Sequence, residues 1–173
     1  MEELDRIDMI VNEFMSLAKP QAGQFERSDL VSIIDSTVNV LHPQAVLENV
    51  QIKSGYSQED KIEIQCSPNQ LKQVFVNVLK NAIEAMPTGG NVFIQIQKLQ
   101  NKRVLITFTD EGMGIDDTLM GYLGTPFYTT KDKGIGLGLT VSNKIIQEHN
   151  GTLKIENRQQ GNGTIVKIEL ESI

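Results

Sequence analysis

Residues 67–86 read SPNQLKQVFVNVLKNAIEAM, and the helix that they predict is the element from which the rest of the chain can be placed. Ser67 is a preferred N-cap residue, and Pro68 suits the first helical position. Gln70 stands three residues after the cap, as in a capping box, so we expect the helix to begin here and to end near Met86. One face is apolar at helical spacing and should be buried. It consists of Leu71, Val74, Phe75, Val78, Leu79 and Ala82.

Three polar residues share another face of this helix. Asn77, Asn81 and Glu84 are spaced four and three residues apart. Asn is a middling helix former that prefers caps and turns, so two of them in a helix interior need an explanation. They could form a solvated flank. Alternatively, their amide oxygens bind a hard cation, because Mg²⁺ takes oxygen ligands and usually shares them with substrate phosphates.

The elements on both sides of this helix follow from apolar spacing and turn residues. Upstream, the pattern predicts a core-covering helix over 28–47 that ends near Pro43, and two short strands over 50–56 and 61–66 around a polar turn. Downstream, it predicts strands over 91–98 and 103–110, a long glycine-bearing loop over 111–136, a helix over 139–149 and a closing hairpin of 152–157 and 164–171. Helices and strands alternate without a strict parallel pattern, so the predicted class is α+β, one sheet with helices on one face.

The first residues carry a separate helical stripe that Pro20 ends. Its apolar residues are Leu4, Ile7, Val11, Phe14 and Ala18. A helix of this length is marginal in isolation, so the stripe needs a partner. The partner is either the chain's own domain or another helix, as in a severed helical hairpin or a dimer contact.

Composition narrows the class of protein. The chain has 173 residues, of which 39% are hydrophobic and 22% charged, as in an ordinary globular protein. The net charge of −6 argues against nucleic-acid binding, which depends on clustered Lys and Arg. A single cysteine, Cys66, excludes an intrachain disulfide framework, and we expect a small buried side chain in a reducing compartment. No segment is apolar enough to cross a bilayer, so we expect the chain to be cytoplasmic, although its parent could be membrane-anchored.

Two glycine motifs add candidate ligand sites. The strand over 103–110 ends in DEGMG, where the Asp110 carboxylate could accept a hydrogen bond from an exocyclic amine and the glycines would admit a planar ligand. Alone, this motif could be an ordinary turn. GIGLGL at 134–139 directly precedes a helix, and such backbone is suited to phosphate. Its place after a long loop, with no GxxxxGK[ST] in the chain, disfavours both the dinucleotide-binding and the P-loop folds.

Together these motifs resemble the Bergerat-type ATPase superfamily of gyrase, Hsp90, MutL and histidine kinases. The sequences of the motifs are most similar to those of sensor histidine kinases of the sporulation and nitrogen-control type. The matching stretches are QVFVNVLKNAIEAM (73–86, the N box), DEGMGI (110–115, G1), PFYTTK (126–131, F) and GIGLGL (134–139, G2), with Gly163 and Thr164 as a last glycine motif. The resemblance implies a two-layer α/β sandwich with a mixed, largely antiparallel sheet, preceded by one N-terminal helix.

The resemblance also implies a domain organisation. LDRIDMIVNEFMSLAKP at 4–20 is similar to the second helix of the dimerisation hairpin in such kinases. Residues 1–19 would then be a remnant of the hairpin that carries the phosphoacceptor, 20–28 a linker and 29–173 the catalytic ATP-binding domain.

The family's site residues carry over by motif and imply ATP and Mg²⁺ as cofactors. Asn81 would bind Mg²⁺, Asn77 would lie beside it at the phosphates, and Lys80 would offset charge. The implied nucleotide-binding residues are Asp110, Gly112, Gly114, Phe127, Lys131, Gly134, Gly136, Gly138, Leu139 and Thr164. Among them, Asp110 would take the adenine amine, and the last three glycines would line the triphosphate. Phe127 would anchor a mobile lid or, alternatively, belong to the core.

One position separates the branches of the superfamily. In the gyrase, Hsp90 and MutL branch, a glutamate one helical turn before the metal-binding asparagine activates water. Here that position is Asn77, which cannot serve as a general base. The γ-phosphoryl group would therefore be held for another nucleophile, a histidine. The chain has only His42 and His149, neither followed by an acidic residue, so we expect neither to be the phosphoacceptor.

The expected partners follow from the resemblance. They are the histidine-bearing dimerisation domain of a parent kinase, a downstream response regulator or phosphorelay protein, and a possible regulatory inhibitor. Two alternatives stay open: a serine kinase of the anti-sigma-factor type, and a non-catalytic interaction module with the same fold. The serine kinase is disfavoured by Asn77 and by the similarity of the first helix to part of a dimerisation hairpin. The interaction module is disfavoured because Asn81, Asp110 and the glycine loop are all intact.

Overall fold

The computed structural model describes residues 24–57, 60–128 and 136–173. In chain order, its elements are β1 (Glu26–Asp29), α2 (Leu30–Leu47), β2 (Val50–Ser54), β3 (Glu63–Cys66), α3 (Pro68–Glu84), β4 (Gly90–Leu99), β5 (Arg103–Asp110), α4 (Asp117–Met120), α5 (Gly138–Glu148), β6 (Thr152–Asn157) and β7 (Thr164–Glu171). The predicted helix within 1–19 lies outside the described residues.

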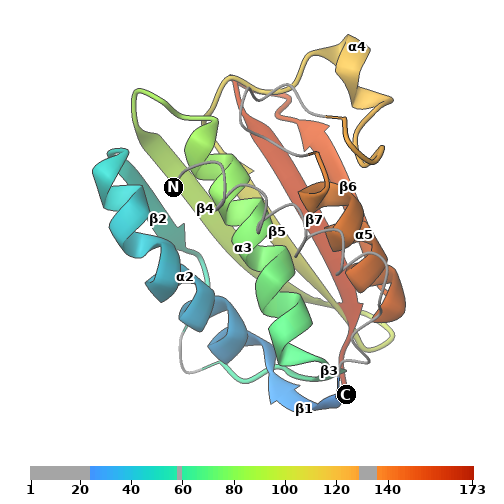
Figure 1. Ribbon diagram of the computed structural model, residues 1–173. Coiled ribbons are helices and arrows are strands. Elements are labelled where there is room, and N and C mark those ends of the chain that lie inside the picture. Colours follow the sequence, from blue (N-terminus) through green and yellow to red (C-terminus); the bar gives the residue numbers. More distant parts are fainter. Residues whose placement is uncertain (1–23, 58–59, 129–135) are drawn as a thin grey trace, which may run out of the picture.

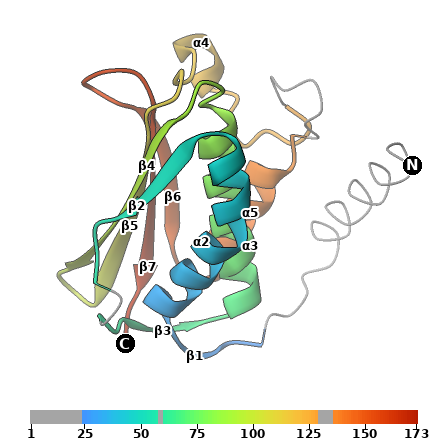
Figure 2. The ribbon, with the colours of Figure 1, turned by 90° about the vertical axis from the view of Figure 1, so that its left-hand side faces the viewer.

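Five strands form the main sheet, in the order β2-β4-β5-β7-β6. β2 and β4 pair in parallel, and every other neighbouring pair in this sheet is antiparallel. Helices α2, α3 and α5 cover one face of this sheet (Figures 1 and 2). The predicted α+β class, with two layers, a mixed sheet and helices on one face, is therefore confirmed.

The segments predicted as two strands around a polar turn do not pair with each other. β2 pairs with β4, and β3 pairs with β1 in a separate sheet of two strands. A parallel pair such as β2 and β4 needs a crossover connection, which α3 supplies, so local sequence could not reveal it. β1, the first element among the described residues, lies partly within the predicted linker 20–28.

The prediction that the first core helix ends near Pro43 is wrong, because α2 continues to Leu47. A proline inside a helix removes one hydrogen bond to the carbonyl four residues earlier. Here that carbonyl belongs to Asn39, and both Asn39 and Pro43 lie on the exposed side of α2. Solvent can satisfy the carbonyl on this side, so the helix tolerates the proline.

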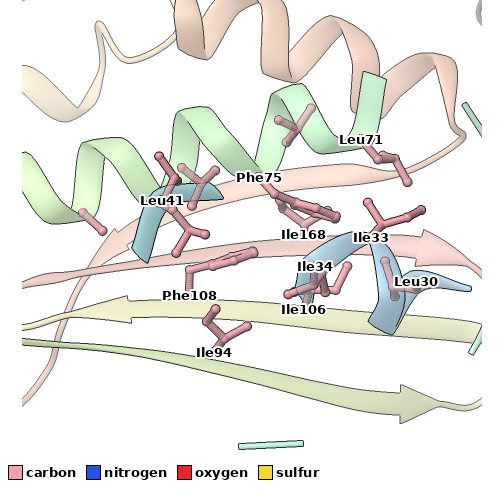
Figure 3. Close-up of a cluster of buried hydrophobic side chains, with 14 of the residues drawn as sticks. Leu30, Ile33, Ile34, Leu41, Leu71, Phe75, Ile94, Ile106, Phe108 and Ile168 are labelled. Atoms are coloured by element: carbon pink, nitrogen blue, oxygen red, sulfur yellow. The ribbon is translucent and has the colours of Figure 1, made fainter. Parts of the chain in front are cut away.

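The core lies between the helices and the sheet, as the alternating strand patterns predicted. Figure 3 shows Phe75 of α3 facing Phe108 of β5, and their ring centroids are 5.8 Å apart. Ile94, Ile106 and Ile168 come from three neighbouring strands and are fully buried in the same cluster. Cys66 is 1% exposed, which confirms it as a small core side chain, and burial raises the pKa of its thiol to about 11.

His149 fixes the beginning of α3. The backbone N–H of Ser67 donates to His149 Nε2 at 3.0 Å, and Nδ1 lies 2.7 Å from the carbonyl oxygen of Ile145. An acceptor at Nε2 requires the neutral ring with its proton on Nδ1, and burial accordingly lowers the pKa of His149. Ser67 is the N-cap residue as predicted, but its side chain makes no capping bond. His149 is thus a structural residue with both nitrogens occupied.

Candidate functional site

The predicted site residues gather at one end of the sandwich. β5 ends there at Asp110, α3 ends there near Asn81, and α5 begins there at Gly138. The loop that carries α4 lies at this same end, and the β1–β3 pair lies at the other (Figure 1). Elements distant in the sequence therefore bring the described parts of the four motif stretches to the same end.

Asp110 is held in a buried cradle. Its position continues the core-facing alternation of β5, and the residue is only 5% exposed. The backbone N–H groups of Gly112 and Thr164 both donate to Oδ1, at 2.9 and 3.1 Å. Oδ2 accepts no hydrogen bond from the described residues, so it can serve a ligand. Burial raises the pKa of Asp110, and the two backbone hydrogen bonds and the positive charge of Arg158 offset this only in part.

The backbone approaches Asp110 from the opposite strand. Gly163 has a φ of +124°, and a Cβ added there would lie 2.0 Å from the carbonyl oxygen of Asp110. No side chain fits at that distance, so this close contact requires glycine. The neighbouring Thr164 is buried, as its N–H bond to Asp110 demands. The last glycine motif thus shapes the Asp110 cradle.

Asn77 joins α3 to α5. Its Nδ2 donates to the carbonyl oxygen of Gly138 at 3.2 Å and to Ser142 Oγ at 3.3 Å. The side chain is therefore not a solvated flank, and its Oδ1 accepts no bond from the described residues. Asn81 and Lys80 are exposed one turn further along, and Lys80 lies 3.9 Å from Glu84.

The glycine loop meets the F box. The N–H of Phe127 donates to the carbonyl oxygen of Gly136 at 3.2 Å. Phe127 is 62% exposed, so it does not belong to the core. Leu139, in the first turn of α5, is half-buried. Lys131 and Gly134 lie outside the described residues.

Two residues at this end were not predicted. Asn157, the last residue of β6, exchanges hydrogen bonds with the backbone of Ile115. Arg158 donates through Nη1 to the carbonyl oxygens of Asp110 at 3.4 Å and Asn162 at 3.2 Å. Asn157 continues the core-facing alternation of β6, as Asp110 does on β5, and this shared pattern was the signal in the sequence.

The arrangement suits a ligand with a planar polar base and an anionic tail. The base would reach Asp110 Oδ2 beside glycine backbone, and the tail would reach Asn77, Asn81 and the start of α5. Within the ranges that the structure describes, no three His, Cys, Asp or Glu side chains gather as a metal site. In the same ranges, no helix is both long and apolar enough to cross a membrane.

Comparison with known proteins identifies this arrangement. Residues 66–172 match the family described as histidine kinase-, DNA gyrase B-, and HSP90-like ATPase. The chain belongs to this family. The matched range contains Asp110, the asparagines of α3 and the glycine loop before α5. Family membership implies that the chain uses ATP, and it confirms the predicted resemblance.

Within this family, the chain is similar to named sporulation kinases. The chain is 49% identical to sporulation kinase E of Bacillus subtilis (strain 168) over 97% of its own length and 22% of the relative's. It is 42% identical to sporulation kinase C of the same organism, over 97% of this chain and 39% of that one. The chain thus spans well under half of these relatives. It is homologous to the ATPase domains of sensor histidine kinases.

Solved structures of histidine kinases have the same fold as this chain. The histidine kinase ThkA, in complex with the response regulator protein TrrA, is similar with a TM-score of 0.80 at 26% identity, covering 99% of this chain and 49% of that one. The mycobacterial sensor histidine kinase MprB shares the fold, with a TM-score of 0.74 at 22% identity over 86% of this chain and 97% of that one.

Proposed function

We propose that this chain is the catalytic ATP-binding domain of a cytoplasmic two-component histidine kinase region, and that it transfers the γ-phosphoryl group of Mg-ATP to a histidine outside residues 29–173. The observation that carries the proposal is the buried carboxylate of Asp110, with Oδ1 saturated by backbone N–H groups and Oδ2 left to a ligand. Such a carboxylate accepts a hydrogen bond from the exocyclic amine of adenine, and guanine has no amine at that position.

Asn77 supports phosphotransfer over hydrolysis. An amide cannot act as a general base, and the Nδ2 group of Asn77 is engaged by α5. With no water activator at this position, catalysis consists of positioning the triphosphate and offsetting its charge. Asn81, Lys80 and the Gly136–Gly138 backbone lie at the end of the site that would hold the phosphates, and we assign Lys131 and Gly134 to it from their motifs alone.

The side-chain oxygen atoms at this end of the site are suited to binding Mg²⁺. Asn77 Oδ1 has no donor among the described residues, and Asn81 is exposed on the same helix. Amide oxygens are ligands that Mg²⁺ accepts, with phosphate oxygens of the nucleotide completing its shell. Bound there, the ion would neutralise charge on the phosphates. We assign Asn81 as its protein ligand.

The partners follow from the relatives. Sporulation kinases and ThkA are named as kinases, and ThkA is seen with a response regulator. We propose that residues 1–19 belong to a dimerisation hairpin, that the acceptor histidine lies on such a hairpin, and that a response regulator or phosphorelay protein receives the phosphoryl group. His149 is excluded as acceptor because both ring nitrogens are bonded in the core.

Calorimetric titration with a non-hydrolysable ATP analogue and Mg²⁺ tests the nucleotide site. Asp110→Asn replaces the acceptor at Oδ2 by a donor, so the affinity is expected to fall about tenfold to a hundredfold, the worth of a hydrogen bond to a charged group. The exposed carboxylate of Asp60 provides a matched control, because Asp60→Asn is the same change away from the site. Equal binding by wild type and Asp110→Asn would contradict the assignment.

The same variant makes a prediction about stability. Burial raises the pKa of Asp110, so its carboxyl stabilises the fold below the unfolded pKa, and this contribution is lost as pH rises through the folded pKa. At pH 7 the ionised group therefore costs stability. Asn keeps the oxygen that accepts from Gly112 and Thr164, so Asp110→Asn should unfold at the same or a higher temperature than wild type. A clearly lower melting temperature at pH 7 would show that the ionised carboxylate is needed by the fold itself.

Phosphotransfer is tested with labelled ATP and a histidine-bearing hairpin domain from a similar kinase. Label that is lost in acid and retained in base indicates phosphohistidine. Acid-stable label would favour the serine kinase alternative, and binding without any transfer would favour an interaction module.

A further inference from the structure

Asn157 ties β6 to the turn that would face the base. Its Oδ1 accepts from the backbone N–H of Ile115 at 2.8 Å, and its Nδ2 donates to the carbonyl oxygen of the same residue at 2.6 Å. The side-chain amide thus pairs with both backbone groups of one residue, as a neighbouring strand would. The pair joins positions 42 residues apart in the chain.

The turn from Gly112 to Ile115 depends on few other attachments. At its start, Gly112 bonds to Asp110, and the N–H of Met113 donates to the carbonyl oxygen of Ala85 at 3.3 Å. At its end, the bonds to Asn157 hold Ile115. Between them, Met113 is 71% exposed. Asn157 is therefore the attachment that fixes the far side of the turn.

The middle of the turn also rests on Asn157. Gly114 has a φ of +75°, and a Cβ added there would lie 3.1 Å from Asn157 Oδ1. The amide therefore lies close against the backbone at the point where a planar ligand would approach. One further contact, from Nδ2 to Asp117 Oδ1 at 3.4 Å, is long for a hydrogen bond and adds little.

We propose that Asn157 is a positioning residue for nucleotide binding: it holds the Gly112–Ile115 turn in the shape that receives the adenine base. This inference rests on the proposed function. Asn157 does not need to touch the ligand, since it acts through the backbone of Ile115 and Gly114. A role limited to closing the β6–β7 hairpin would leave base recognition unchanged.

Asn157→Leu removes both hydrogen bonds at similar side-chain size. Affinity for the non-hydrolysable ATP analogue is expected to fall about tenfold, because the turn must then be ordered by the ligand. Affinity for inorganic tripolyphosphate, which has no base, should change less than twofold. Amide hydrogen exchange at Ile115 should become faster in the variant, because its N–H loses its acceptor.

Two further variants separate positioning from general damage. Asn162→Leu makes the same change at an exposed position of the same hairpin and should bind both ligands as wild type does. Asn157→Asp keeps the side-chain shape but places an oxygen against the Ile115 carbonyl, so a folded domain with selectively weakened ATP binding is expected.

The outcomes are distinct. Wild type that binds no ATP analogue contradicts the proposed function and this inference together. Wild-type binding with unchanged ATP affinity in both Asn157 variants contradicts this inference alone. Equal losses for ATP and tripolyphosphate also overturn it, because they indicate damage to the whole site.

Discussion

The two ends of the candidate site are built differently. At the base end, the Asp110 carboxylate is buried and receives backbone bonds from its own turn and from β7. At the phosphate end, Lys80 and Asn81 are exposed on α3, and Phe127 is exposed in the loop before α5. Asn77 at this end is tied to a second element by its bonds to α5.

This difference indicates that the two ends of the site differ in how far they are ordered before a ligand binds. Groups that are already ordered lose little conformational freedom when a ligand arrives, whereas exposed side chains must be immobilised by it. On the proposed function, the base end would therefore receive adenine in a site that exists before binding. On the proposed function, the exposed side chains of the phosphate end would be ordered by the arriving charge, so substitutions that disrupt the packing of the base end should disturb the fold most.

The largest effect is expected at Gly163. Gly163→Ala would put a Cβ 2.0 Å from the carbonyl oxygen of Asp110 at a strained φ, so the free energy of unfolding should fall by at least about 3 kcal/mol. Gly161→Ala is the matched control, since Gly161 also has a positive φ but faces open space; it should cost about 1–2 kcal/mol. Urea denaturation measures both. Equal costs would mean that the base end is not tightly packed.

An intermediate effect is expected at Asn77. Asn77→Ala removes two hydrogen bonds between α3 and α5, so the free energy of unfolding should fall by about 1–2 kcal/mol. The exposed Asn69 in the first turn of α3 provides the control, because Asn69→Ala is the same substitution on the same helix away from α5. If both variants are equally stable in urea, the tie between the helices contributes nothing to the phosphate end.

The smallest effect on stability is expected at Lys80. Its pairing with Glu84 is exposed and 3.9 Å long, so Lys80→Ala should change the free energy of unfolding by less than about 0.5 kcal/mol. Affinity for ATP should nevertheless fall a few-fold at low salt and less at high salt, because a charge near the triphosphate is screened by ions. Lys98→Ala on β4 is the control. A salt-independent loss would contradict a charge role.

Much of this architecture followed from local patterns. The strands 103–110, 152–157 and 164–171 have the predicted bounds, because alternation of apolar and polar residues marks a strand with one buried face. The helix over 139–149 begins one residue earlier than predicted and ends at Glu148. Each of these elements carries its own periodic signal, so no information from distant residues was needed.

Pairing and continuity were harder to predict. The partner of β2 is β4, separated from it by β3 and α3, and alternation says nothing about which edge a strand joins. Pro43 suggested a helix end, but the end of a helix depends on whether solvent or protein surrounds the freed carbonyl. Both outcomes depend on the assembled layers.

The class of fold and the order of the motifs could be read from the sequence, and the motifs predicted Asp110, Asn77 and Asn81 as site residues, because motif spacing is a local property of the chain. How these residues are held depends on contacts between distant segments. The bond from Asn77 to Gly138, the contact of Gly163 with Asp110 and the pairing of Asn157 with Ile115 each join segments more than 40 residues apart. Such contacts exist only after the strands and helices have packed, since no local preference encodes them.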